Sequence, residues 1–358
     1  MDIILNWFKR TFSDPQVVLL GVIVIGILLT INFMSGMLAP VIAAIVISFI
    51  LDSPVGWLGR RGMPHIIAVI LVFMAFIVLA VMVMILGVPP LAEQIGDFFK
   101  EVPRMITSLQ GALIELQARF PEYISPDQIK DSFAKIGTEA ASQGANLVSI
   151  GLSGVTSTLT LLVYLILVPV MVFFFLKDKA AIFTFLKGFM PSHRGLAETV
   201  WHETVTKSGD YARGKVYEIF IVGSVALIVF NAIGLKYAAL LAVVTGLSVI
   251  IPYIGATVIT IPVALVAVFQ WGLGPDFAIA VGAYLVIQAL DGNVLAPLLF
   301  SEVVKLHPNA IILAILVFGG IWGLWGVFFA IPLATVVDAI LRAWRQHARS
   351  VAIEDNQE

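Results

Sequence analysis

The stretch IIAVILVFMAFIVLAVMVMILGV, residues 66–88, contains no charged side chain. A helix needs about 20 apolar residues to cross a hydrocarbon core roughly 30 Å thick, so this stretch predicts a membrane-spanning helix. Similar charge-free segments occur at residues 155–176 and 219–235. The chain is therefore predicted to cross a membrane several times.

The composition of the whole chain agrees with this prediction. Of the 358 residues, 60% are hydrophobic and only 12% are charged, against about 25% charged in an ordinary soluble domain. The absence of cysteine excludes disulfides and thiolate metal sites. The net charge of −2 gives no indication of nucleic-acid binding. We therefore expect an all-α, polytopic membrane protein with no nucleic-acid partner.

Basic residues predict the orientation of the first segments. One basic pair, at residues 9–10, precedes the first apolar segment and another, at residues 60–61, follows the second. Under the positive-inside rule both flanks are cytoplasmic. Residues 17–51 would then form a hairpin that turns near residues 35–36, with a second arm that spans or re-enters the membrane. Residues 1–88 are expected to hold this hairpin and a third span.

A long polar insertion is predicted at residues 89–154. Its eight acidic residues outnumber its five basic ones, which suits the extracytoplasmic side. Apolar residues recur at helical spacing from Ile95 to Leu116 and again from Ile129 to Ile136. We expect these amphipathic helices to pack on each other and on the membrane domain; a gate and a subunit contact are the alternatives.

The span at residues 155–176 returns the chain to the cytoplasm. Residues 177–215 hold seven basic and four acidic residues, as expected for the cytoplasmic side. Residues 181–190 are expected to lie in the membrane interface, and a helix from Gly195 is expected to run on into the membrane. The remaining parts are a C-terminal membrane core with broken helices, residues 216–341, and a cytoplasmic tail, residues 342–358.

Two segments of this core are interrupted by glycine and proline. Residues 237–270 contain Pro252-Tyr253-Ile254-Gly255, and residues 310–341 contain GGIWGLWG. Broken helices expose backbone carbonyls and helix ends to a cavity, so in transporters they indicate the substrate region. Each segment fits either one kinked span or a re-entrant hairpin.

Asp291 is the acidic residue that lies deepest in an apolar segment of the second half. It occurs in LVIQALDGNVLAPLL, residues 285–299. Glu218 and Asp338, in contrast, lie near segment ends, where water at the membrane interface is enough to hydrate an ionised carboxylate. An ionised carboxylate at mid-membrane costs about 2.5 to 3.5 kcal/mol on insertion scales. The Asp291 carboxyl must therefore be protonated, paired or in contact with water.

The spacing around Asp291 leaves two interpretations. Tyr284, Gln288 and Asp291 share one helical face, which predicts a polar stripe directed at a cavity or another helix and a direct part in transport. In the other interpretation Asp291 or Asn293 caps a half-helix at a break formed by residues 292–297.

The enzyme motifs in the chain are incomplete. GDYARGKV, residues 209–216, has the spacing of a phosphate-binding loop, but Val216 stands where serine or threonine would bind the metal of the nucleotide. Trp201-His202-Glu203 lacks the second histidine of a zinc protease motif. We expect no enzymatic activity, no cofactor and no metal site.

Three C-terminal motifs together resemble the autoinducer-2 exporter family, the PerM-like permeases. They are IIPYIGATVITIP (residues 250–262), QALDGNVLAPLL (288–299) and LHPNAIILAILVFGGIWGLWGVFFAIPL (306–333). The resemblance extends over nearly the whole chain, including LVPVMVFFFLKDK (167–179) and GDYARGK (209–215). The motif positions that carry over are Pro252, Tyr253, Gly255, Asp291, Asn293, Pro297, His307 and Pro308.

The resemblance implies a bacterial inner-membrane secondary transporter with about eight membrane segments. Some family members resemble exporters of the quorum-sensing signal autoinducer-2, and others are similar to sodium or lithium/proton antiporters. Homo-oligomeric assembly, as a pentamer, is also suggested by the family. Both termini are expected in the cytoplasm.

The function that we expect is proton-motive-force-driven export of a small polar metabolite such as autoinducer-2. Asp291 would exchange a proton, Tyr284, Gln288 and Asn293 would bind the substrate, and the two broken segments would flex. One alternative is sodium or lithium/proton antiport, with a monovalent cation at Asp291. A second alternative is an oligomeric pore or membrane scaffold organised by residues 89–154.

Overall fold

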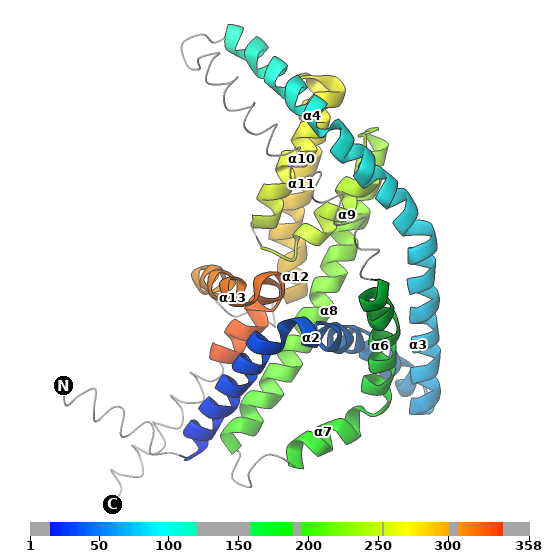
Figure 1. Ribbon diagram of the computed structural model, residues 1–358, viewed down its shortest axis with the longest axis vertical. Coiled ribbons are helices and arrows are strands. Elements are labelled where there is room, and N and C mark those ends of the chain that lie inside the picture. Colours follow the sequence, from blue (N-terminus) through cyan, green and yellow to red (C-terminus); the bar gives the residue numbers. More distant parts are fainter. Residues whose placement is uncertain (1–14, 120–157, 189–194, 253, 301–306, 339–358) are drawn as a thin grey trace, which may run out of the picture. The chain divides into compact units, whose positions relative to one another are not determined.

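The protein is all-α in a computed structural model that describes residues 15–119, 158–188, 195–252, 254–300 and 307–338 (Figure 1). These ranges contain no β-strand, and the fold class predicted from the sequence is confirmed. The elements, in chain order, are α2 (Pro15–Arg60), α3 (His65–Met82), the π-helical turn η1 (Val83–Gly87), α4 (Val88–Arg119), α6 (Thr158–Lys177), α7 (Lys179–Gly188), α8 (Gly195–Ala232), α9 (Ala238–Ser248), α10 (Ile254–Trp271), α11 (Pro275–Leu290), the π-helical turn η3 (Asp291–Leu295), α12 (Ala296–Phe300) and α13 (Pro308–Phe328).

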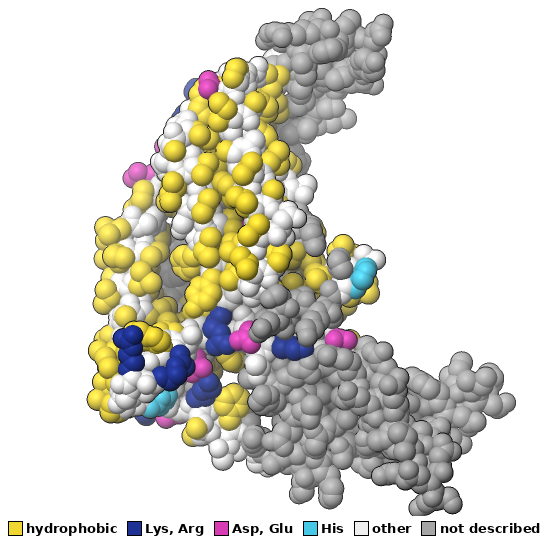
Figure 2. All heavy atoms as spheres, turned by 180° about the vertical axis from the view of Figure 1, so that it is seen from behind, with side chains coloured by type: hydrophobic (Ala, Val, Ile, Leu, Met, Phe, Trp, Pro, Cys, Tyr) yellow, Lys and Arg dark blue, Asp and Glu magenta, His cyan; other side chains and the backbone are white. Residues whose placement is uncertain are grey.

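Five of the described helices are long and apolar enough to cross a membrane, and three shorter helices are also apolar. They agree with the polytopic membrane protein expected from the sequence. Many large apolar side chains on them are exposed; Leu86, Ile228 and Leu298 each expose about two-thirds or more of their surface. Figure 2 shows hydrophobic side chains over most of the described surface on one face. Such a surface is stable in lipid but not in water.

The chain forms two compact units. The first comprises Met1–Phe73, Leu165–Gly214 and Phe300–Glu358, and the second comprises Met74–Tyr164 and Lys215–Leu299. Each unit has its own apolar core.

In the first unit, α2, α3 and α6 pack through small and β-branched side chains. Ala44 of α2, Val69 of α3 and Val172 of α6 are completely buried in one cluster. Just after α6, the Lys179 ammonium lies 2.8 Å from the Asp52 carboxylate of α2. This partly exposed ion pair links the start of α7 to α2.

Helix α2 differs from the predicted N-terminal hairpin. It runs from Pro15 to Arg60 without a turn at Ser35 and Gly36. Serine and glycine do not break a helix in lipid, because the freed backbone groups would find no other hydrogen-bonding partner there. Residues 17–51 are therefore part of one long helix rather than two antiparallel arms.

In the second unit, the core lies among α4, the second half of α8, and α9 to α11. Met105 of α4 is completely buried in it, together with Val263 of α10. Phe98 of α4 packs edge-on against Tyr237, with ring centroids 5.6 Å apart. For the described part of the insertion, the expected packing on the membrane domain is therefore confirmed. The predicted helix at residues 129–136 lies outside the described residues.

Both glycine- and proline-interrupted segments double back on themselves. A Cβ added at Gly255, just after the end of α9, would lie 1.8 Å from the Ser248 carbonyl oxygen. A Cβ at Gly326 would lie 1.8 Å from the Phe318 carbonyl oxygen, beyond a turn at Gly323, where φ is +58°. Backbones this close require a sharp reversal. Of the two predicted alternatives, the structure has the hairpin in both segments.

Candidate functional site

Two oppositely charged side chains are buried in the middle of α8. Lys215 and Glu218 each expose only 3% of their surface, and they are one helical turn apart, on the same face. The Lys215 ammonium lies 2.5 Å from Glu218 Oε2. Glu218 Oε2 has no hydrogen-bond donor among the described residues, and the contact is an ion pair.

The Lys215 ammonium also contacts the end of the short helix α9. It donates a hydrogen bond of 2.9 Å to the carbonyl oxygen of Val249, the residue that follows α9. The last carbonyls of a helix have no partner within the helix and carry partial negative charge. The lysine thus satisfies a helix end that the break between α9 and α10 leaves open.

A second carboxyl group, that of Asp291, meets Glu218 from η3. The two side chains lie within hydrogen-bonding reach of each other, and Lys215 is close enough to Asp291 to attract it electrostatically. Asp291 Oδ1 is buried and has no hydrogen-bond donor. Helices α8 and η3 therefore bring two carboxyl groups and one ammonium together in an apolar part of the protein.

The polar face predicted for α11 exists and continues this cluster. Tyr284 is completely buried, and its hydroxyl donates a hydrogen bond of 2.5 Å to the Ala256 carbonyl oxygen in the first turn of α10. Gln288 lies close to Tyr284, and its Nε2 is buried without an acceptor. Tyr284, Gln288 and Asp291 thus run along one face, from the start of α10 to Glu218.

Glycines allow the helices around the cluster to approach closely. Helix α8 crosses α9 where Gly223 faces Gly246, and a Cβ at Gly246 would lie 2.7 Å from the Ile219 carbonyl oxygen. Small residues at such crossings are typical of membrane helices, because they let the backbones touch. The crossing holds Glu218, the neighbour of Ile219, beside the end of α9.

Several predicted site residues lie apart from this cluster. Asn293 is exposed, and its amide donates to the Ala289 carbonyl oxygen of its own helix at 2.8 Å. Pro297 is exposed on α12. The segment from α11 to α12 is one helix with a π-helical turn, so no half-helix begins at Asp291 for it or Asn293 to cap.

The other predicted positions that the structure describes belong to turns and helix ends. Pro252 and Gly255 form the reversal between α9 and α10, where the Ile254 amide donates to the Pro252 carbonyl oxygen at 2.7 Å. Tyr253 lies outside the described residues. His307 is exposed and accepts a bond from the Asn309 amide through Nδ1, at 3.3 Å, and Pro308 begins α13. Pro252 and Gly255 thus shape the backbone between α9 and α10.

Sequence reasoning missed Lys215 and Glu218. Glu218 was expected to sit near a segment end in contact with water, whereas it is almost completely buried. The signal that would have found the pair is their spacing of three residues, which lets the two charges neutralise each other on one helix face.

A second polar cluster joins α4 to the turn between α8 and α9. The Lys236 ammonium lies 2.7 Å from the Glu101 carboxylate, and Gln94 accepts a bond from the Leu240 amide at 3.0 Å. The hydrogen bond to the Glu101 carboxylate raises the pKa of Lys236. Because both charged side chains are partly exposed, this cluster is an attachment point rather than a buried site.

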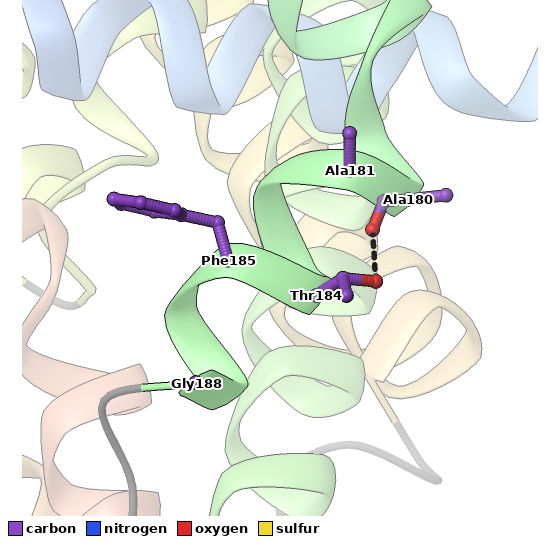
Figure 3. Close-up of a pocket in the computed structure, with 5 residues that line it drawn as sticks. All are labelled: Ala180, Ala181, Thr184, Phe185 and Gly188. Atoms are coloured by element: carbon purple, nitrogen blue, oxygen red, sulfur yellow. Dashed lines mark hydrogen bonds between the residues drawn. The ribbon is translucent and has the colours of Figure 1, made fainter.

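A shallow hollow on α7 is drawn in Figure 3. Its described lining is Ala180, Ala181, Thr184, Phe185 and Gly188. The Thr184 hydroxyl already donates to the Ala180 carbonyl oxygen, at 2.9 Å, and Phe185 points away from the helix and is exposed. The hollow offers little to orient a polar solute, and its exposed aromatic side chain is typical of a helix at a membrane surface.

The comparisons with known proteins identify the family. The model of the family described as "AI-2E family transporter" matches residues 21–346. The chain is a member of the AI-2E transporter family. It is 42% identical over 354 residues to the "Putative permease PerM" of Escherichia coli K12, covering 96% of this chain and 98% of that protein.

More distant relatives of this member of the AI-2E transporter family extend the similarity. The "Putative transport protein YrrI" of Bacillus subtilis is 26% identical over 310 residues, covering 84% of this chain and 85% of that protein. The "Putative transport protein MT0215" of Mycobacterium tuberculosis is 28% identical over 310 residues, covering 86% of this chain and 83% of that protein. The chain is therefore a multi-pass membrane protein of a transporter family, and these relatives are named for transport rather than for catalysis.

Proposed function

We propose that this protein is a proton-coupled secondary transporter that exports a small polar solute such as autoinducer-2. The observation that supports this most is the contact of Glu218 and Asp291 beside Lys215, buried between α8 and η3. The expectation that Asp291 exchanges a proton is thereby extended to a pair of carboxyl groups.

The charges in the cluster favour one bound proton. Two ionised carboxylates and one ammonium leave a net charge of −1, and an uncompensated charge inside an apolar protein is costly. Two carboxyl groups in contact do not readily ionise together, so they share a proton. With one proton the cluster is neutral, and loss of that proton restores the unbalanced charge.

Proton exchange would change how α8 and η3 interact. With the proton present, one carboxyl donates a hydrogen bond to the other and holds the two elements together. Without it, two negative charges repel each other across the same contact. An interaction that is attractive with the proton and repulsive without it gives the two states that alternating access requires.

The unpaired Gln288 amide supports a polar, hydrogen-bonding substrate. Gln288 Nε2 is a buried donor without an acceptor, and leaving such a group unpaired costs about 1 to 3 kcal/mol. A substrate hydroxyl or carbonyl oxygen would remove that cost. Autoinducer-2 is an example of such a solute, and its support is the description of the family.

The remaining parts of the proposal concern location and assembly. We place the protein in a bacterial inner membrane with both termini in the cytoplasm, on the distribution of basic residues. Assembly into a homo-oligomer, as a pentamer, rests on the family resemblance. Cross-linking in native membranes and native mass spectrometry would measure the number of subunits.

The decisive experiment is accumulation of autoinducer-2 in respiring everted membrane vesicles. Wild type should accumulate it and lose accumulation when the proton gradient is collapsed. Asp291→Asn should not accumulate it at a matched protein level. Asp276→Asn is the matched control, because this exposed aspartate lies in the first turn of α11, away from the cluster.

The other outcomes discriminate among the alternatives. If wild type does not accumulate autoinducer-2, the substrate is wrong, and sodium- or lithium-dependent proton movement becomes the test. If Asp291→Asn transports as well as wild type, the carboxyl pair does not couple transport. An ohmic conductance that ignores the proton gradient would favour the pore or scaffold.

A further inference from the structure

The position of Lys215 resembles that of a bound cation. Its ammonium contacts a Glu218 carboxylate oxygen at 2.5 Å and the Val249 carbonyl oxygen at 2.9 Å. Asp291, beside Glu218, attracts the ammonium electrostatically. A carbonyl at the end of a broken helix, together with carboxylates, is the donor set that coordinates sodium in secondary transporters. In this protein the chain supplies the cation itself.

We infer that Lys215 occupies a monovalent-cation site formed by the Val249 carbonyl oxygen and the Glu218 carboxylate, next to Asp291, and thereby restricts this site to protons. The inference deepens the proposed function, because it takes the same carboxyl pair as the coupling site and assigns its ion selectivity to one residue. Lys215 is tethered to α8, so it neutralises one carboxylate permanently. Only one negative charge remains to be neutralised, and the proton shared by Glu218 and Asp291 neutralises it.

Charge counting predicts what removal of the ammonium does. Without Lys215, the two carboxyl groups carry a net charge of −1 even when they share a proton. The Val249 carbonyl oxygen and the facing carboxylate oxygen then lack a positive partner in a buried place, which is costly. A sodium or lithium ion supplies that charge and accepts those oxygens as ligands. In Lys215→Gln, the side-chain carbonyl oxygen supplies one more ligand for that ion.

A purely structural ion pair would behave differently. A buried pair that only joins α8 to α9 loses stability when the lysine is removed, and sodium does not restore it more than other cations do. The two interpretations are therefore separated by ion-specific binding rather than by loss of stability.

The experiment measures binding of radioactive sodium to the purified full chain in detergent, at neutral pH in a sodium-free choline buffer. Wild type and Lys215→Arg, which keeps the positive charge, should show no saturable sodium binding. Lys215→Gln should bind one sodium ion per chain, with competition by lithium and little by choline. Adding Glu218→Gln to Lys215→Gln should abolish the gained binding and so locate it.

Lys215→Gln is destabilised by the loss of its ion pair, and a second readout covers that case. Sodium, but not choline, should then raise its melting temperature and its recovery as a monodisperse species, with no such effect on wild type. Lys215→Thr, with a smaller side chain, should respond in the same direction.

Three results would overturn the inference. They are saturable sodium binding by wild type, a monodisperse Lys215→Gln that binds no sodium, and a destabilised Lys215→Gln and Lys215→Thr that sodium does not protect. None of these readouts requires transport. Gained sodium binding together with a fully active Asp291→Asn would overturn the proposed function alone, whereas no gain together with an inactive Asp291→Asn would overturn the cation site alone.

Discussion

Substitution of Gly246 by alanine tests the close crossing of α8 and α9. The added Cβ would lie 2.7 Å from the Ile219 carbonyl oxygen and 3.0 Å from the Gly223 Cα. Both atoms belong to the backbone, so relief requires the helices to separate. Overpacking of this kind lowers the free energy of unfolding by about 1 to 3 kcal/mol. Alanine has a higher helix propensity than glycine, which offsets about 1 kcal/mol of that loss.

Gly282 provides the control for that gain in helix propensity. It lies in α11, and nothing stands within 4 Å of a Cβ built on it. Gly282→Ala therefore gains helix propensity without overpacking, and the difference between the two variants isolates the crossing. Since 1 kcal/mol shifts the melting temperature by about 2 to 4 °C in domains of 150 to 250 residues, Gly246→Ala should melt several degrees below Gly282→Ala.

The assay is thermal unfolding of both purified variants in the same detergent, followed by circular dichroism. Gly246→Ala should also transport less in vesicles at a matched protein level, because moving the Ile219 carbonyl displaces the neighbouring Glu218 carboxyl. Equal melting temperatures for the two alanine variants would refute the close crossing. A lower melting temperature with unchanged transport would show that the crossing does not position Glu218.

Two further predictions concern the second hairpin and the attachment of α4. Gly326→Ala should greatly reduce the yield of folded protein, because its Cβ meets the Phe318 carbonyl oxygen at 1.8 Å, whereas Gly320→Ala has open space and should express normally; equal yields would contradict the reversal. A double-mutant cycle of Lys236→Met and Glu101→Gln should give a coupling of only about 0.2 to 1 kcal/mol, weakened by salt. The contribution of Lys236 to stability is fully present below pH 10.5 and is lost as the pH rises through its raised pKa. A larger coupling free energy that salt does not weaken would mean that the pair is buried.

Helical spacing predicted the polar face of α11 correctly. Tyr284, Gln288 and Asp291 are separated by four and three residues, and a helix places such residues on one face whatever its neighbours are. The helix predicted to run from Gly195 into the membrane is also present, as α8. These features depend on local geometry, which the sequence determines directly.

The partners of that face could not be predicted in the same way. The exposure of Glu218 was predicted from its distance to a segment end. A hydropathy scale scores each charged residue by itself and takes no account of a neighbour of opposite charge. The burial of Glu218 depends on Lys215 on its own helix and on the Val249 carbonyl oxygen 34 residues away. Asn293 lies apart from the buried cluster, because its amide donates a hydrogen bond to the Ala289 carbonyl oxygen one turn back. No pattern of hydrophobicity records such a local bond, and a part for Asn293 in substrate binding stays a prediction.

The paired charges, the end of α9 and the polar face of α11 all lie in one unit of one chain, within residues 215–299. Each copy in an assembly would then hold a complete exchange site and borrow no side chain from a neighbour. In membranes where active and inactive copies are mixed, the transport rate should fall in direct proportion to the inactive fraction. An inactive allele would accordingly be recessive, because each subunit would transport independently of its neighbours.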